Sequence, residues 1–278
     1  MAEVIYIKYN RTRKEEFQIR TAILEENGRK WVEKSALTDA GIPHIEAFLW
    51  KYKGLTKQSS AVRAAEPILS EDGSCARFPY LEGKTLAELL GHKIRDGKAP
   101  VKELAEVMDK ICQVKDGCLV PFQVTREFGK VFGEFVRLKD VSMTVTNIDM
   151  LLENILVTGD GWYAIDYEWV YDFPVPVRFV KYRILFYFYR KYGSLMEYKD
   201  LGHFLAQFGI SEKEAETYDE MEVRFQHYVH GENQETYMLK YRKNYRQVEE
   251  LVGVEEEMKE AREQLSHMSE LEYELENR

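Results

Sequence analysis

The chain has 278 residues, of which 39 are Lys or Arg and 48 are Asp or Glu, so its formal net charge is −9. With 45% hydrophobic and 13% aromatic residues it can bury a full core, which excludes a disordered or collagen-like chain. The acidity is concentrated at one end, because residues 247–278 carry 11 acidic and 3 basic side chains and the rest is nearly balanced. No basic excess therefore marks a nucleic-acid-binding surface.

We expect neither a signal peptide nor a membrane-spanning segment. The most apolar helical stretch, residues 184–189, is far too short to cross a bilayer and has basic residues on both sides. Three cysteines without zinc-type spacing are typical of reduced thiols. These features predict a cytoplasmic protein.

In the first third of the chain, apolar and polar residues alternate as in β-strands, and one stretch has helical spacing. Strands are expected over residues 4–8, 17–24, 30–37, 63–69 and 74–80, and a helix over residues 40–52. Helical spacing follows over residues 85–90, 102–115 and 125–135, and again after Pro174 and Pro176. A short hairpin around a Gly-Asp-Gly turn is expected at residues 154–166.

This order predicts an α+β fold with two lobes and a terminal helix. The expected domains are a mostly β lobe (1–82), a helical lobe with the small hairpin (83–246) and an acidic helix (247–278). The acidic helix has apolar or small residues in alternating steps of three and four, which indicates a coiled coil for a homo-oligomer or a partner protein. The alternative is one amphipathic helix packed on its own lobe.

The most informative segment is residues 147–169, NIDMLLENILVTGDGWYAIDYEW. Asp149 precedes Asn154 by five residues, and Asp166 follows at the end of the returning strand, so the hairpin brings three oxygen-bearing side chains to one edge. One carboxylate can orient or deprotonate a hydroxyl, and the other, with the amide oxygen, can hold Mg²⁺ on nucleotide phosphates. The alternative is a surface hairpin in which Asp and Asn cap turns.

This segment resembles the protein-kinase-like phosphotransferases, in particular the aminoglycoside and choline phosphotransferase branch. That branch reads His-Gly-Asp-x4-Asn-Ile-Leu followed by Ile-Asp-aromatic-Glu, and this chain has Asn147-Ile148-Asp149, Asn154-Ile155-Leu156 and Ile165-Asp166-Tyr167-Glu168. The resemblance implies a bilobal protein-kinase-like fold, ATP and Mg²⁺ as cofactors, Asp149 as the catalytic residue, and Asn154 and Asp166 as metal ligands.

The order of the other elements fits the same family. The resemblance implies Lys34, in Trp31-Val32-Glu33-Lys34, as the phosphate-binding lysine, and Glu46 in the next helix as its partner. Either residue could instead be a solvated surface charge. The run Phe78-Pro79-Tyr80-Leu81-Glu82-Gly83 is similar to an interlobe hinge, which implies nucleotide binding near Phe78, Tyr80 and Leu81. A plain turn between strand and helix has the same local sequence.

The chain departs from the family pattern at three places. Asn147 stands where the family has histidine, and no glycine occurs between Tyr9 and Gly28, so no glycine-rich loop covers the phosphates. Side chains such as Arg13 or Lys14 would then replace backbone amides there. The third departure is the short connection from Asp166 to Pro174, which excludes a long activation segment and favours a small-molecule or glycan hydroxyl as acceptor.

The stretch DYEWVYDFPVPVRFVKYR, residues 166–183, narrows the resemblance. It is similar to the kinase modules of bacterial methyltransferase–kinase proteins that terminate O-antigen chains, in which a coiled coil follows the kinase. This implies phosphorylation of a sugar or glycan hydroxyl in surface polysaccharide (lipopolysaccharide) synthesis. Two alternatives stay open: a pseudokinase scaffold in the same pathway, and a small-molecule kinase of the aminoglycoside or choline type.

Overall fold

The computed structural model describes residues 2–59, 61–94, 100–134 and 136–231. The chain divides into two units, Met1–Gly231 and Glu232–Arg278. The second unit lies outside the described residues, and with it the expected acidic coiled coil at 247–278. All the described helices and strands belong to the first unit.

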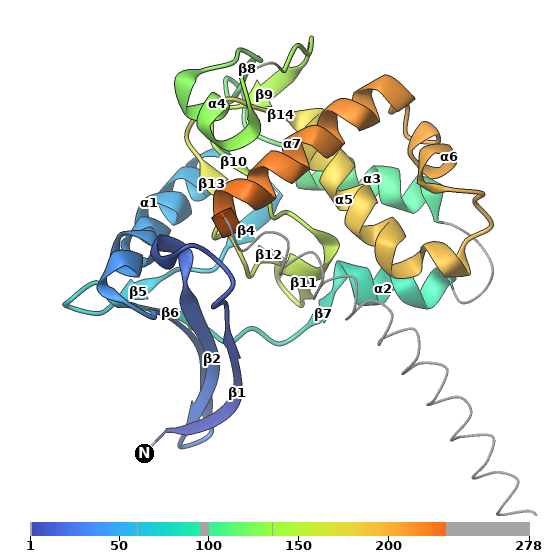
Figure 1. Cartoon of the computed structure of the whole chain (residues 1–278). Coiled ribbons are helices and arrows are strands. Elements are labelled where there is room, and N and C mark those ends of the chain that lie inside the picture. The colour runs from blue at the N-terminus through green and yellow to red at the C-terminus, as the bar shows by residue number, and fades with distance from the viewer. Residues whose placement is uncertain (1, 60, 95–99, 135, 232–278) are drawn as a thin grey trace, which may run out of the picture. The chain divides into compact units, whose positions relative to one another are not determined.

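Five antiparallel strands form the N-terminal sheet, in the order β1-β2-β3-β6-β5. They are β1 (Glu3–Tyr9), β2 (Ile19–Glu26), β3 (Arg29–Ala36), β6 (Cys75–Pro79) and β5 (Ile68–Leu69) (Figure 1). The β2–β3 turn has positive φ at Asn27 (53°) and Gly28 (74°), a tight hairpin geometry that the pair Asn-Gly favours. This turn sets the register that places Lys34 opposite Thr21, and β6 places Ala76 on the other side of Lys34.

Helix α1 (Ile42–Gln58) packs on this sheet. Its residues Ile45 and Phe48 are 0% exposed and share one hydrophobic core with Ile19, Ala76 and Phe78. Pro43 lies in the first turn of the helix, where its missing N–H group costs no hydrogen bond. The helix therefore holds the inner face of the sheet in place around Lys34.

A second sheet carries the expected catalytic hairpin, in the order β4-β12-β11-β7. Its strands are β4 (Val62–Ala64), β12 (Gly161–Ala164), β11 (Ile155–Thr158) and β7 (Lys84–Thr85). Since β4 pairs with β12 and β7 with β11, segments from the first third of the chain fix both sides of the hairpin. Two smaller ladders pair β10 (Thr146–Asn147) with β13 (Val170–Tyr171), and β14 (Val175–Pro176) with β9 (Val141–Met143) and β8 (Leu119–Pro121).

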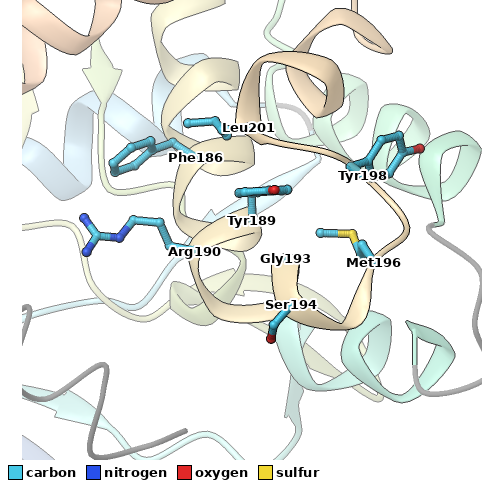
Figure 2. A pocket seen from close by; sticks show the side chains of 8 residues that line it. All are labelled: Phe186, Tyr189, Arg190, Gly193, Ser194, Met196, Tyr198 and Leu201. Atoms are coloured by element: carbon cyan, nitrogen blue, oxygen red, sulfur yellow. The ribbon is translucent and has the colours of Figure 1, made fainter.

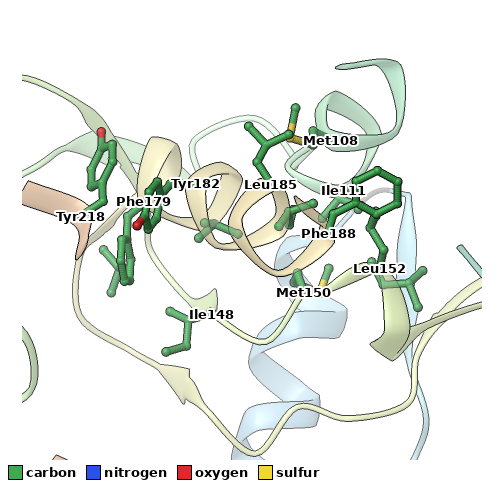
Figure 3. Close-up of a cluster of buried hydrophobic side chains, with 14 of the residues drawn as sticks. Met108, Ile111, Ile148, Met150, Leu152, Phe179, Tyr182, Leu185, Phe188 and Tyr218 are labelled. Carbon is green, nitrogen blue, oxygen red and sulfur yellow. The ribbon is translucent and has the colours of Figure 1, made fainter. Parts of the chain in front are cut away.

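The remainder is helical and packs around a second core (Figure 3). The helices are α2 (Leu86–Ile94), α3 (Val101–Ile111), α4 (Arg126–Phe132), α5 (Val177–Tyr192), α6 (Leu201–Ala206) and α7 (Glu212–His230). Single 3-10 turns occur at Glu15–Phe17, Asp39–Gly41, Leu152–Asn154 and Gly193–Leu195. Phe179 and Leu185 of α5 are fully buried, so this helix runs through the centre of the core.

The expected α+β fold class, with a β-rich N-terminal region and a helical C-terminal region, is confirmed. Some boundaries differ from the sequence expectation. The strand expected at 63–69 is two short strands, because β4 leaves the first sheet to pair with β12. The helix expected at 125–135 ends at Phe132, where Gly133 has a φ of 97° that right-handed helices do not allow. No described helix is both long and apolar enough to cross a membrane.

Candidate active site

Lys34 lies on the central strand β3, and its ammonium group meets two carboxylates that follow β12. The Nζ atom is 2.9 Å from Asp166 Oδ1 and 2.6 Å from Glu168 Oε1, and the residue is 3% exposed. Burial alone would lower the pKa of Lys34, but the charges of Asp166 and Glu168 outweigh it and raise the pKa above its usual range. The structure thus brings the predicted lysine to the predicted metal-binding aspartate.

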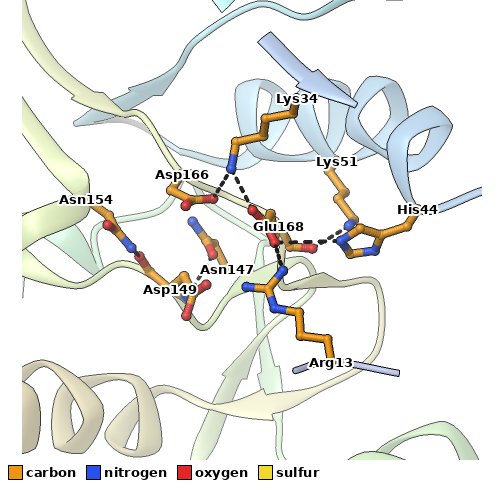
Figure 4. Close-up of polar contacts among 9 residues, drawn as sticks. All are labelled: Arg13, Lys34, His44, Lys51, Asn147, Asp149, Asn154, Asp166 and Glu168. Atoms are coloured by element: carbon orange, nitrogen blue, oxygen red, sulfur yellow. Dashed lines mark hydrogen bonds and ion pairs between the residues drawn. The ribbon is translucent and has the colours of Figure 1, made fainter. Parts of the chain in front are cut away.

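Glu168 is the centre of a buried group of charges (Figure 4). Its carboxylate accepts hydrogen bonds from Lys34 and from Arg13, and its backbone oxygen accepts one from Lys51 Nζ. His44 Nε2 is 3.8 Å from the same carboxylate. Burial would raise the pKa of Glu168, yet Arg13 and Lys34 hold it well below its ordinary value. Glu168 is therefore ionised and joins three segments that are far apart in sequence.

The expected pair between Lys34 and Glu46 does not form, which corrects the sequence expectation. Glu46 lies on the exposed side of α1, with its carboxylate against Gly73. His44 and Lys51 occupy the buried side of the helix, and Glu46 is two residues from His44, about 200° around the helix axis. Lys34 binds Glu168 instead.

Asp149 lies in the loop after β10 and is held at three points. Its backbone N–H donates to Asn147 Oδ1 (2.9 Å), its backbone oxygen accepts from Asn154 Nδ2 (3.0 Å), and its Oδ1 is 3.0 Å from Arg183 Nη1. Burial raises the pKa of Asp149 to about 6, although Arg183 acts in the opposite direction. A fixed carboxylate with a pKa near neutrality is suited to take a proton from a hydroxyl group.

Asn154 and Asp166 stand at the open end of the β11–β12 hairpin. The backbone N–H of Ile165 donates to Asn154 O (2.9 Å), so the hairpin register carries Asp166 one residue beyond the position opposite Asn154. The side-chain nitrogen of Asn154 donates to the backbone oxygen of Asp149, so the side-chain oxygen of Asn154 is left as a ligand for a cation. The Asp166 side chain is 36% exposed and binds Lys34 through one oxygen only.

This donor set fits Mg²⁺, which prefers oxygen ligands and keeps water and substrate phosphates in its shell. Among the described residues, no group of three or more His, Cys, Asp or Glu side chains could hold a metal ion. Asn154 and Asp166 would hold the ion, with phosphate oxygens and water completing its coordination.

The predicted hinge residues lie at the end of β6 and in the connection from β6 to β7. Phe78 is 5% exposed and packs edge-on against Phe48 (5.2 Å between ring centroids), so its side chain belongs to the core. Tyr80 is 38% exposed, with Lys30 Nζ 5.6 Å from its ring centroid, and Leu81 packs against the N-terminal core. A role of Tyr80 and Leu81 at a nucleotide base stays a prediction.

The sequence motifs do not mark several residues of the site. Glu168 enters only as part of the motif at residues 147–169, and that motif contains none of Lys51, His44 and Arg183. Lys51 and His44 recur at helical spacing with buried apolar residues of α1, which is the signal that could have marked them. Burial lowers the pKa of Lys51 to about 8 and also lowers the pKa of His44.

A cavity of about 610 Å³ lies at the end of α5 (Figure 2). Its lining includes Phe186, Tyr189 and Tyr198. A second cavity, of about 490 Å³, is lined by residues of β4, β12 and the end of α1. None of the charged residues around Glu168 and Asp149 lines either cavity.

No protein-family model matches the chain. No curated protein matches it. Among solved structures, a macrolide 2′-phosphotransferase from Brachybacterium faecium is similar, with 11% identity and a TM-score of 0.43 over 87% of this chain and 90% of that one. Choline kinase from Streptococcus pneumoniae has 12% identity and a TM-score of 0.40, over 82% and 90%. WaaP, solved with acyl carrier protein, has 14% identity and a TM-score of 0.40, over 76% and 85%. These values are low, so the chemistry of the site is inferred from the chain's own residues.

Proposed function

We propose that the protein is an ATP- and Mg²⁺-dependent phosphotransferase with an alcohol group as acceptor. The observation that carries this proposal is the bridge from Lys34 on β3 to Asp166 and Glu168, with Asp149 and Asn154 at the same end of the hairpin. The bridge joins residues 132 and 134 positions apart. A capping role of Asp and Asn in a surface hairpin does not require a buried lysine from another sheet.

Each residue has a distinct part in the proposed reaction. Lys34 would bind phosphate oxygens of the nucleotide, and Tyr80 and Leu81 would lie at the base. Mg²⁺, held by Asn154 and Asp166, would supply positive charge next to the phosphates. Asp149 would orient the acceptor hydroxyl and take its proton, so that catalysis rests on positioning and charge neutralisation.

We further propose that the acceptor is a sugar or glycan hydroxyl in bacterial surface polysaccharide synthesis. Two observations support this finer assignment: the similarity of residues 166–183 to glycan-terminating kinase modules, and the immediate entry of the chain into β13 after Glu168. Without a long segment there, little of the chain could align a protein substrate. The need for ATP would place the reaction in the cytoplasm.

The test combines nucleotide binding with transfer to short glycans. We expect Asp149→Asn to bind Mg·ATP like the parent and to transfer phosphate about 10²- to 10⁴-fold more slowly. Asp166→Asn should weaken Mg²⁺-dependent ATP binding. The control is Asp160→Asn in the turn of the same hairpin, a 64%-exposed residue paired with Arg63, which should change neither property.

Two results would contradict the proposal. Transfer by Asp149→Asn at the parental rate would remove Asp149 from the reaction. If calorimetry with millimolar Mg·ATP shows no heat for the parent, the pseudokinase scaffold is favoured instead.

A further inference from the structure

The connection between β1 and β2, residues 10–18, carries a second feature of the site, and its interpretation rests on the proposed phosphotransferase function. No glycine occurs in this connection, so its backbone lacks the freedom with which glycine-rich loops wrap a phosphate. Contacts from the β1–β2 connection to a nucleotide would therefore have to come from side chains. Three cations, Arg11, Arg13 and Lys14, lie in this connection.

The connection is held in place by the end of α7. The backbone N–H of Lys14 donates to Val229 O at 2.8 Å, and His230 Nδ1 lies 2.9 Å from Thr12 O. Gln18 Nε2 also donates to the backbone oxygen of Arg13 at 2.8 Å. Because these bonds fix the backbone on both sides of Arg13, its side chain starts from a defined position.

The ring of Phe17 adds a second attachment. It lies between two aromatic residues, with centroid distances of 5.0 Å to Trp169 and 5.3 Å to Tyr228. Trp169 follows Glu168 directly in the chain, so this contact ties the connection to the same segment that binds Lys34.

The side chain of Arg13 points into the buried group of charges around Glu168 (Figure 4). Its Nη1 atom donates to Glu168 Oε2, while Lys34 binds the other oxygen, Oε1, of the same carboxylate. The guanidinium also lies 5.5 Å from the ring centroid of Trp169. Two cations from different segments thus converge on one carboxylate beside Asp166.

Lys14 points elsewhere. Its Nζ atom lies 5.2 Å from the ring centroid of Tyr228 on α7. Its methylene carbons lie close to Gly231. Arg11 also points elsewhere, with its Cζ atom 5.0 Å from the ring centroid of Tyr9. Of the three cations in the connection, the structure records a hydrogen bond to Glu168 from Arg13 alone among the described residues.

We infer that Arg13 binds the phosphate chain of the nucleotide, with its side chain replacing the backbone amides of a glycine-rich loop. A guanidinium has five N–H groups, and in the described part of the chain the structure records one hydrogen bond from it, to Glu168. Its planar fork matches two phosphate oxygens, which a single ammonium group does not. Glu168 would hold Arg13 and Lys34 side by side for the incoming phosphates.

The inference is tested by comparing ligands that differ in the number of phosphates. Calorimetry gives the Kd of Mg·ATP and Mg·ADP, and an NMR titration gives that of adenosine. We expect Arg13→Gln to weaken Mg·ATP and Mg·ADP by about 10- to 100-fold, because one charged hydrogen-bonding partner of the phosphates is lost. Adenosine, which has no phosphate, should bind Arg13→Gln with the same Kd as the parent. Lys14→Gln is the matched control from the same connection and should leave all three constants unchanged.

Arg13→Lys distinguishes lost phosphate binding from a folding defect, because it keeps the positive charge beside Glu168. It should unfold at the parental temperature and bind Mg·ATP with intermediate affinity. Parental Mg·ATP affinity in Arg13→Gln would overturn the inference, and so would an equal loss of affinity in Lys14→Gln or an equal weakening of adenosine. If the parent itself does not bind Mg·ATP, the proposed function is wrong and this inference falls with it. If only the variant result is contrary, the proposed function stands.

Discussion

Arg183 of α5 is the residue whose removal most directly tests the buried charge network behind Asp149. It is 2% exposed, and its Nε atom is 2.7 Å from Glu222 Oε2 on α7, while Nη1 is 3.0 Å from Asp149 Oδ1. The same Nη1 donates to the backbone oxygen of Ile148. One guanidinium thus joins two helices to the loop that carries Asp149.

The variant Arg183→Met keeps much of the side-chain length but removes the charge. Glu222, 5% exposed, and Asp149 would then be buried without their cation. Removing one partner of a buried ion pair costs about 3–5 kcal/mol. For a domain of this size, 1 kcal/mol corresponds to roughly 2–4 °C in Tm, so we expect a decrease of roughly 6–20 °C.

Calorimetric unfolding of parent and variant at pH 7 measures this decrease. The matched control is Arg178→Met, because Arg178 joins the same two helices through Glu214 at 3.0 Å but with side chains 39% and 29% exposed. A pair this accessible to solvent is worth about 0–1 kcal/mol, and Arg178→Met also removes one exposed hydrogen bond to Gly209 O, so the control should lose only a few degrees. In the double variant Arg183→Met/Glu222→Met both charges are gone, and part of the stability should return.

Equal losses of Tm in Arg183→Met and Arg178→Met would refute this reasoning, because burial would then make no difference to the two pairs. A double variant as unstable as the sum of its single variants would show that the charges of Arg183 and Glu222 are not coupled.

Two further changes have defined outcomes. Gly83→Ala would place a Cβ atom 2.3 Å from the carbonyl oxygen of Val157 and should cost about 1–3 kcal/mol by urea denaturation, whereas Gly159→Ala, with open space, should be neutral within error. His44 has a pKa lowered by burial, so on acidification through about pH 6.5 the unfolded state takes up the proton first and stability falls. His44→Phe should show a shallower loss of stability between about pH 6.5 and 5 than the parent, and an unchanged slope, with the exposed His92→Phe as control, would contradict this.

The α+β order and the hairpin of the site could be predicted because their signals are local. The pair Asn27-Gly28 determines a two-residue turn, and that turn sets the register of β3 and hence the position of Lys34. Asp149, Asn154 and Asp166 lie within one continuous segment whose hairpin pairs neighbouring residues. The proximity of Asn154 and Asp166 therefore follows from strand geometry, and Asp149 lies only five residues before Asn154.

The partners of these residues were decided only by the tertiary structure. Lys34 meets Glu168 at a separation of 134 residues, and Arg13 meets it at 155. Helical periodicity separates the buried face of α1 from the exposed one, but it does not say which segment packs on that face. The choice of Glu168 over Glu46, and of Arg13 over Lys14, depends on how the N-terminal sheet, the hairpin and α7 pack together. Charged side chains at buried positions are stable only because segments distant in sequence supply the opposite charges. No local sequence pattern shows which segments these are.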